Sequence, residues 1–352
     1  MSRRQRVLIY RTGHLGDTVC AIPAFRLIRQ NYPDAELTLL CDLGAPSKVA
    51  ARDVVATLGI FDTILCYRSL AAGHVLTDLV ARILQASPDQ AILLPQSRES
   101  SNSVARKRAL FRSLGVGSVL GEYMPPPTGG WRLPEPYRLL EMLRRCGLAG
   151  AKPAYDISTS STYSGQTQEL LRRAGIEPDL PFLVFCGGGK AASQRWPMKR
   201  YASVLSAIRP RLLQPVVAIG SAAECAEYRR LMHPNDVLVL DPVSSCAVLF
   251  EILRLAWAYF GNDTGVMHVA AAMSCPVAAV ISARNFPGSW DPDVEPSRIF
   301  RHRLPCEGCF VQECVTQQHR CMAEIGVEEV IEGLQSFFVA VDEVWSVRRT
   351  MG

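Results

Sequence analysis

The chain has 352 residues, 48% of them hydrophobic and 20% charged, and its 38 basic residues outnumber its 33 acidic residues by five. A single hydrophobic core rarely grows past about 250–300 residues, so this length predicts two domains. The composition excludes a disordered or fibrous chain, and the small positive surplus argues against a nucleic-acid-binding protein. The same charge suits an anionic small substrate or an anionic membrane surface.

Targeting and membrane signals are weak. The most apolar stretches are far shorter than the ~20 residues of a membrane-spanning helix. Residues 1–6 are basic, as in a signal peptide, but only residues 7–10 are apolar before Arg11, and a signal sequence needs about 7–15 apolar residues. We therefore expect a cytoplasmic protein. Of the twelve cysteines, the eight that are scattered singly are expected to be small buried apolar residues.

Short apolar runs alternate with amphipathic segments along the chain, which predicts parallel sheets with helices on both faces. The predicted strands are residues 7–10, 37–41, 63–66 and 91–94 in the first half, and 182–186, 216–219, 237–240, 258–261 and 277–281 in the second. The clearest predicted helices are residues 21–31, 199–208, 222–232 and 327–345.

A stretch of small and polar residues, 149–168, interrupts this alternation and is the predicted linker. We therefore expect an α/β protein with two doubly wound, Rossmann-like domains, residues 1–155 and 156–352, that face a cleft. In such domains ligands bind at the carboxyl ends of the strands. The loops that follow the predicted strands are therefore the candidate binding elements.

The loop after the first strand contains Gly13 and Gly16 and leads into Asp17. The glycines allow a tight turn and the close approach of a ligand to the backbone. A single Gly-x-x-Gly pair does not make a dinucleotide-binding fingerprint. Asp17 stands where a helix begins, so it is either an N-cap or a carboxylate directed into the cleft as a general base.

The loop after the predicted strand 182–186 has three consecutive glycines followed by a group of cations. Exposed glycine amides and positive charge suit a phosphate or a pyrophosphate, although a plain glycine turn with surface cations is the alternative. The segment is not a P-loop, because no Ser or Thr follows the lysine. The candidate binding residues here are Gly187, Gly188, Lys190, Arg195 and Lys199.

A third loop, residues 261–268, ends another apolar strand and opens a helix at Thr264 and Gly265. The amides at a helix N-terminus form an anion site. Asp263 either accepts a hydrogen bond from a ribose hydroxyl or caps the helix, and His268 is either a ligand contact or a core histidine. Glu224, after a further strand, either reaches a nucleoside hydroxyl or favours the first turn of its helix. Together these loops predict a nucleoside diphosphate bound by the second domain.

Four cysteines lie within sixteen residues: Cys306, Cys309, Cys314 and Cys321. This spacing predicts a structural zinc site and, less strongly, an iron–sulfur cluster. Reduced thiols or a pair of disulfides are the alternative.

A basic segment follows the predicted strand 91–94 in the first domain. It is either a solvated helix face or the binding site of an anionic acceptor. Its candidate acceptor-binding residues are Arg98, Arg106 and Arg108.

These loops resemble those of glycosyltransferase family 9, the heptosyltransferase-like enzymes of lipopolysaccharide core synthesis. The resemblance rests on the opening residues 7–24 with their Leu-Gly-Asp at 15–17, on Arg-Trp-Pro at 195–197, and on the Asn-Asp-Thr-Gly-x-x-His segment at 262–268. It covers residues 6 to 335, and the last segment is the most specific.

The resemblance implies a GT-B fold whose first domain binds the acceptor and whose second domain binds the nucleotide sugar. It implies an inverting transfer that requires no cofactor or metal, commonly from ADP-heptose, onto a glycan or lipid-linked glycan acceptor, at the inner face of the cytoplasmic membrane or in the cytoplasm. Asp17 matches the general base of the family. Asp263, Thr264, Gly265 and His268 match its donor-binding loop, and Glu224 matches a contact to the donor ribose.

The sequence also departs from the family. Gln194 stands where many members have lysine, and residues 281–290 replace a common Phe-Gly-Pro-Thr-Asp-Pro segment near the donor sugar. The alternatives are a GT-B nucleotide-sugar 2-epimerase, a non-catalytic nucleotide-binding protein, and a redox or metal sensor built on the four cysteines.

Overall fold

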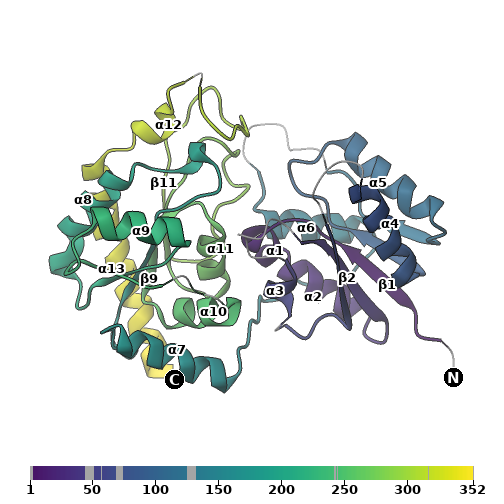
Figure 1. The fold of residues 1–352 in the computed structure, drawn as a ribbon, viewed down its shortest axis with the longest axis horizontal. Helices are drawn as coiled ribbons and strands as arrows, with labels where there is room; N and C mark the ends of the chain where they lie inside the picture. The colour runs from purple at the N-terminus through teal and green to yellow at the C-terminus, as the bar shows by residue number, and fades with distance from the viewer. Residues whose placement is uncertain are drawn as a thin grey trace. The chain divides into compact units, whose positions relative to one another are not determined.

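The computed structural model describes residues 3–43, 51–56, 58–68, 74–124, 132–241, 243, 245–315 and 317–351. The chain divides into two compact units, Met1–Ser158 and Thr159–Gly352 (Figure 1). The sequence placed this division three residues earlier, between residues 155 and 156.

The first unit contains a five-stranded parallel sheet in the order β3-β2-β1-β4-β5. Its strands are β1 (Arg6–Tyr10), β2 (Glu36–Asp42), β3 (Thr63–Tyr67), β4 (Gln90–Leu93) and β5 (Ser118–Leu120). Its helices are α1 (Leu15–Val19), α2 (Ile22–Asn31), α3 (Ala51–Val55), α4 (His74–Ala86), α5 (Ser101–Ser113) and α6 (Glu135–Arg145). The sequence did not predict β5, since only its middle residue is buried.

Helices cover both faces of this sheet. Leu8 and Tyr10 of β1 pack against Leu79 and Ile83 of α4 and against Phe111 of α5. Helices α2 and α6 pack against each other and lie away from α4 and α5 in Figure 1. The strand order reverses between β1 and β4, and the loops at the carboxyl ends of these two strands therefore flank the switch point where ligands bind in such sheets.

The second unit contains a six-stranded parallel sheet in the order β11-β10-β9-β6-β7-β8. Its strands are β6 (Leu183–Cys186), β7 (Val216–Ala218), β8 (Val237–Val239), β9 (Ala258–Asn262), β10 (Val277–Val280) and β11 (Ser297–Phe300). Its helices are α7 (Ser161–Arg173), η1 (Ala192–Gln194), α8 (Met198–Ile208), η2 (Arg209–Arg211), α9 (Ala222–Leu231), α10 (Cys246–Leu255), α11 (Gly265–Ala272), α12 (Arg320–Ala323) and α13 (Val327–Met351).

The core of the second unit is aromatic on one face of the sheet. Phe185 of β6 packs edge-on against Tyr201 of α8 and Tyr228 of α9, with ring centroids 5.0 and 5.4 Å apart. Leu334 and Phe337 of α13 belong to the same buried cluster. The apolar spacing of the last predicted helix therefore reflects docking of α13 on this face. Here too the strand order reverses, between β6 and β9, and marks the carboxyl ends of these strands as the binding edge.

Two local expectations differ from the structure. Residues 149–168 are not all linker, because α7 begins at Ser161 and buries Thr167 and Leu171, and α7 packs against α10. The small polar residues that suggested a linker instead lie at the start of an amphipathic helix. Strand β11 also escaped prediction, because only Phe300 of its four residues is buried.

Among the described residues, no helix combines the length and the apolar character that crossing a membrane requires.

Candidate functional site

The first loop of the first unit follows β1 and carries Asp17. His14 is the N-cap of α1, and Asp17 lies at the third helical position, where its Oδ2 accepts a hydrogen bond from the His14 amide at 3.1 Å. Asp17 is half-buried. The carboxylate therefore stabilises its own helix, as the N-cap interpretation expected, although from inside the first turn rather than from the cap position.

Gly13 makes this turn possible. Its φ is +134°, a value that side chains disfavour, and a Cβ there would lie 2.4 Å from the Cβ of Asp17. The Gly13 amide donates to Oδ1 of Asp42 at 3.0 Å, at the end of neighbouring β2. The loop is thus held both by Asp42 of the neighbouring strand and by its own Asp17.

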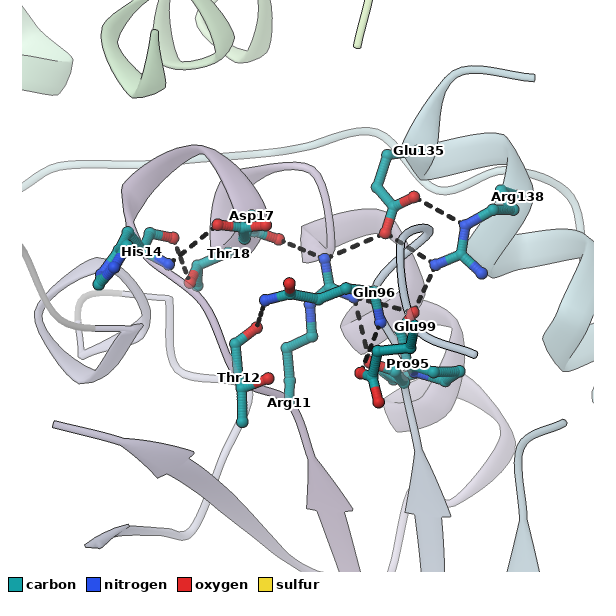
Figure 2. A network of polar contacts seen from close by, with 11 residues as sticks. Arg11, Thr12, His14, Asp17, Thr18, Pro95, Gln96, Glu99, Glu135 and Arg138 are labelled. Atoms are coloured by element: carbon teal, nitrogen blue, oxygen red, sulfur yellow. Dashed lines mark hydrogen bonds and ion pairs between the residues drawn. The ribbon is translucent and has the colours of Figure 1, made fainter. Parts of the chain in front are cut away.

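Behind Asp17 lies a buried ionic network, which we call the Arg11 network: Arg11, Glu135 and Arg138 (Figure 2). Arg11 is fully buried, and its Nη2 donates to the Asp17 carbonyl at 3.0 Å and to Oε1 of Glu135 at 3.1 Å. Arg138, one turn further along α6, pairs with Oε2 of Glu135 at 2.7 Å. The guanidinium of Arg11 therefore fixes the backbone position of Asp17.

Glu135 and the two arginines of this network stabilise each other's charged forms. Burial opposes ionisation of Glu135, but the two arginines outweigh it and hold the pKa of Glu135 below its ordinary value. Glu135 in turn raises the pKa of Arg138 against the opposing effect of burial. An ionised carboxylate between two guanidiniums is the arrangement that makes a buried ion pair tolerable.

A second layer of contacts ties this loop to β4. Arg11 also donates to the carbonyls of Leu94 and Pro95, at 3.1 and 3.3 Å. The side-chain amide of Gln96 donates to the Thr12 carbonyl at 2.9 Å, and its backbone amide donates to Oε1 of Glu99 at 3.0 Å (Figure 2). The loops after β1 and β4, which flank the switch point, therefore form one hydrogen-bonded assembly.

The three arginines predicted to bind an acceptor lie in or near this assembly but make different contacts. Arg98 is exposed in the loop between β4 and α5, and Arg106 is exposed on α5. Arg108 pairs with Glu122 at 3.1 Å. Lys107, between the last two, pairs instead with Glu99.

In the second unit, the glycine loop after β6 is held by protein groups. The Gly187 amide donates to the Tyr228 hydroxyl at 3.1 Å, and the Gly189 amide donates to Oε1 of Glu224 at 3.2 Å. A Cβ on Gly188 would come within 1.8 Å of the same Glu224 oxygen. The glycines thus make room for Glu224, and two of the three amides that the sequence offered to a phosphate already have protein acceptors.

Glu224 also caps its own helix. Its Oε2 accepts from the amide and the hydroxyl of Ser221, both at 2.8 Å, which completes a capping box at the start of α9. The carboxylate thus bridges the loops after β6 and β7.

Asn262 at the end of β9 joins the glycine loop to the loop that carries Asp263. Its side-chain amide donates to the carbonyls of Gly187 and Gly188 at 2.7 and 3.0 Å. Its oxygen accepts from the Tyr201 hydroxyl at 2.6 Å. Asn262 is fully buried, so its hydrogen-bonding groups depend on these partners.

Asp263 is buried at the carboxyl edge of the same sheet. Its Oδ2 accepts from Gln194 at 3.2 Å and from Asn285 at 3.1 Å, and His268 approaches its Oδ1 at 3.8 Å. Burial raises the pKa of Asp263, while His268 and the hydrogen bond from Gln194 oppose the rise. Three loops, after β6, β9 and β10, therefore converge on one carboxylate.

The remaining predicted residues lie around this point. Thr264 is the N-cap of α11, and its hydroxyl accepts from the Met267 amide at 3.4 Å, while Gly265 opens the helix. His268 is buried and packs against the Trp290 ring, with centroids 5.6 Å apart. Lys190, Arg195 and Lys199 are exposed, and Arg195 donates to the Gly189 carbonyl at 2.8 Å.

The four clustered cysteines line one small cavity of about 20 Å³, together with Arg284 and His319. Burial raises the pKa of Cys321, and the three other thiols add to the rise, which reflects their proximity. As the side chains lie, no three His, Cys, Asp or Glu residues of the described chain are arranged to hold a metal ion.

Sequence reasoning missed several groups that build these sites. Arg11 directly follows β1, but its partner Glu135 is 124 residues away and nothing in the local sequence identifies it. Asn262 and Asn285 were missed as organising groups because their roles depend on contacts between loops. Gln194, noted as a departure from the family pattern, proves to be a hydrogen-bond partner of Asp263.

Comparison with known proteins bears out the resemblance. Lipopolysaccharide heptosyltransferase 1 of Pseudomonas aeruginosa is 27% identical over 144 residues, which are 41% of this chain and 40% of that protein. The chain thus spans less than half the length of this curated relative.

Solved structures agree in fold over nearly the whole chain. The glycosyl transferase family 9 protein of Veillonella parvula has a TM-score of 0.73 at 16% identity, over 95% of this chain and 97% of that one. ADP-heptose lps heptosyltransferase II of E. coli has a TM-score of 0.64 at 17% identity, over 95% and 99%. The iron-containing dodecameric glycosyltransferase TibC of enterotoxigenic E. coli has a TM-score of 0.55 at 14% identity, over 96% and 77%.

These structures confirm the predicted α/β class with two parallel sheets in GT-B architecture. The family model for glycosyltransferase family 9 (heptosyltransferase) matches residues 129–319, more than half of the sequence. The chain therefore belongs to glycosyltransferase family 9.

Proposed function

We propose that this chain transfers a sugar from a nucleoside diphosphate sugar to a hydroxyl of a glycan acceptor, with inversion at the anomeric carbon. The observation that carries the proposal is the convergence of three loops of the second unit on Asp263, next to the N-terminus of α11. A helix N-terminus with nearby cations suits a diphosphate, and a buried carboxylate suits recognition of a hydroxyl.

The donor diphosphate is expected at α11 rather than in the cradle of the glycine loop. The Gly187 and Gly189 amides donate to Tyr228 and Glu224, so we do not propose them as the primary phosphate ligands. The amides that follow Thr264 supply the helix dipole, and the exposed Lys190 and Lys199 supply charge. These groups would stabilise the negative charge that develops on the leaving diphosphate.

Asp17 is the proposed general base. The acceptor oxygen would form a bond to the anomeric carbon while the bond from that carbon to the diphosphate breaks, and the hydroxyl proton would pass to the Asp17 carboxylate. The Arg11 network holds the Asp17 carbonyl, and the His14 amide holds one carboxylate oxygen. Such positioning limits the motion of the base before reaction, as general-base catalysis requires.

The donor sugar, the acceptor and the metal requirement are also proposed. The chain's family and its similarity to heptosyltransferases favour a heptose donated by ADP-heptose and a lipopolysaccharide-core or lipid-linked acceptor. We propose that the acceptor binds the first unit beside Arg98 and Arg106, in the cytoplasm or at the inner membrane surface. The transfer is proposed to need no divalent metal, because the described cations and helix dipole can take over the stabilisation of charge.

The test combines binding and turnover. Calorimetric titration with ADP, UDP and GDP, in buffer containing a chelator, should give selective saturable binding of ADP that Asp263→Asn weakens. Turnover of ADP-heptose with a core-oligosaccharide acceptor should then fall ~10²–10⁴-fold in Asp17→Asn, with unchanged ADP binding. The surface variant Asp89→Asn is the matched control, since Asp89 is exposed and pairs with Arg3.

Each alternative has its own outcome in this test. Preference for UDP or GDP would keep the transferase but remove ADP-heptose. Conversion of the donor without any acceptor would indicate an epimerase, and saturable binding without turnover of any sugar nucleotide would indicate a non-catalytic protein.

We also propose that the four-cysteine cavity takes up a structural metal ion, zinc in the first instance. The proximity of four thiols supports this, and iron enters as the alternative because the similar TibC glycosyltransferase contains iron. The thiols would have to move to coordinate an ion. Elemental analysis of the purified chain, with a Cys306→Ser, Cys309→Ser double variant as control, would give about one equivalent of metal in the native chain. A metal-free native chain would refute the assignment.

A further inference from the structure

Two cysteines outside the four-cysteine cavity lie side by side in the first unit. Cys41 and Cys66 are register partners on the neighbouring parallel strands β2 and β3. Their sulfur atoms are 3.7 Å apart. No step of the proposed transfer uses either residue.

Their backbone geometry is compatible with a disulfide. Neighbouring strands lie about 4.7–4.9 Å apart, which falls within the ~4.4–6.8 Å range of Cα separations in disulfides. Register partners also project their side chains to the same face of a sheet. The sulfurs therefore need to approach by only about 1.7 Å, given the ~2.05 Å length of the bond.

The two thiols differ in access and in acidity. Cys41 is fully buried, whereas Cys66 is half-buried and lines a surface hollow of about 500 Å³ with Arg52, Asp53 and Arg82. The hydrogen bond from Cys41 lowers the pKa of Cys66 to about 7, and Arg52 lowers it further against burial and Asp53. The hydrogen bond and burial raise the pKa of Cys41. Cys66 is thus the more accessible and the more acidic of the two thiols, and Cys41 is buried directly beside it.

We propose that Cys66 and Cys41 form a redox pair that hydrogen peroxide oxidises to a disulfide and that a small-molecule or protein thiol reduces again, with Cys66 as the reacting thiol and Cys41 as the resolving thiol. The Cys66 thiolate attacks one peroxide oxygen, so that a sulfur–oxygen bond forms and the oxygen–oxygen bond breaks. Hydroxide leaves and is protonated to water, and Cys66 becomes a sulfenic acid. The Cys41 sulfur then attacks the Cys66 sulfur and loses its proton, and water leaves as the disulfide forms. Two thiols are thereby oxidised by one peroxide, which is reduced to two waters.

The test is peptide mapping of the full chain after brief treatment with hydrogen peroxide. Tryptic cleavage at Arg29, Lys48, Arg52 and Arg68 places Cys41 in residues 30–48 and Cys66 in residues 53–68, each as the only cysteine of its peptide. We expect these two peptides to be linked in the oxidised chain, and to separate after reduction. Recovery of both cysteines as alkylated free thiols from oxidised, folded protein would overturn the proposal.

Two variants separate the roles. Cys41→Ala should leave a Cys66 sulfenic acid that dimedone traps, whereas Cys66→Ala should give neither the adduct nor the link. A dimedone adduct on Cys41 in the Cys66→Ala chain would overturn the assignment of the reacting thiol. Cys20→Ala is the control for loss of a buried cysteine in the same unit, since Cys20 is also buried, and it should leave the link unchanged.

The rate of alkylation gives an independent measure. At pH 7 a thiol of pKa about 7 is half ionised, against about 3% for an ordinary thiol of pKa ~8.5. Its lower intrinsic nucleophilicity offsets part of this gain, which leaves an expected rate about three-fold above an ordinary thiol. Arg52→Ala should reduce that advantage. A Cys66 rate below that of an ordinary exposed thiol would contradict the role of Cys66.

Discussion

Replacing Glu135 by glutamine tests whether the Arg11 network is a structural anchor. Glu135 is 1% exposed and pairs with the fully buried Arg11 and with Arg138. Glutamine keeps the shape and an acceptor oxygen but removes the negative charge, which leaves two guanidiniums without a counterion. Removing one member of a buried pair destabilises a protein by about 3–5 kcal/mol, and we expect the lower end, about 3 kcal/mol, because one hydrogen bond can remain.

The same helix supplies the matched control. Glu141 and Arg145 of α6 are 3.0 Å apart, but their side chains are 37% and 59% exposed. The same change, Glu141→Gln, should alter stability by less than about 1 kcal/mol, because water screens exposed pairs. Both variants delete one negative charge from the same helix, but Glu135 is buried between two arginines whereas Glu141 is partly exposed and pairs with one.

The assay is hydrogen exchange of the amides in β1 and β4, which reports on the first unit alone. A loss of about 3 kcal/mol corresponds to roughly 100-fold faster exchange through unfolding. The difference should also depend on pH. Because Arg11 and Arg138 hold the pKa of Glu135 low, the wild-type advantage is present above pH ~4.3 and is lost as the pH falls through the lower folded-state value. Equal protection of Glu135→Gln and Glu141→Gln would refute the reasoning.

Further predictions concern the loops. Gly13→Ala should lower stability by ~1–3 kcal/mol, measured by thermal unfolding, because φ is +134° and the new Cβ would meet Asp17; an unchanged melting temperature would show that the turn is not required. Gly188→Ala should weaken nucleotide binding at least ~10-fold by calorimetry, because the new Cβ would displace Glu224. Unchanged affinity would show that Glu224 takes no part in nucleotide binding. Asp263→Asn should stabilise the second unit at pH 7 while weakening nucleotide binding. Burial raises the pKa of Asp263, so the wild type should regain stability relative to this variant as the pH falls through that raised pKa. Urea unfolding at pH 4 to 7 measures this difference. A wild type that loses stability relative to the variant over this range would contradict a raised pKa.

Much of this fold follows from local sequence patterns, because buried strands are short continuous apolar runs. Strands β1 and β9, for example, are predicted within two residues of their observed ends. Strands β5 and β11 carry one buried residue each, so their pairing depends on the sheet they join rather than on their own pattern.

The candidate sites were predicted less completely than the fold. The Asp17 and Asp263 loops could be identified because glycine and acidic residues follow strands. The contacts that hold them could not, since Arg11 meets Glu135 and Asp263 meets Asn285 across 124 and 22 residues. The sequence also did not reveal a second reason for Gly188: its missing side chain makes room for the Glu224 carboxylate.

The single amide of Asn262 has a consequence for engineering this protein. Because it binds the carbonyls of Gly187 and Gly188 and is itself held by Tyr201, the loops after β6 and β9 constitute one module. Grafting either loop alone from another transferase would break hydrogen bonds in a site closed to water. An exchange of the proposed donor preference would therefore have to carry both loops together with the α8 tyrosine, because the three parts depend on one set of buried hydrogen bonds.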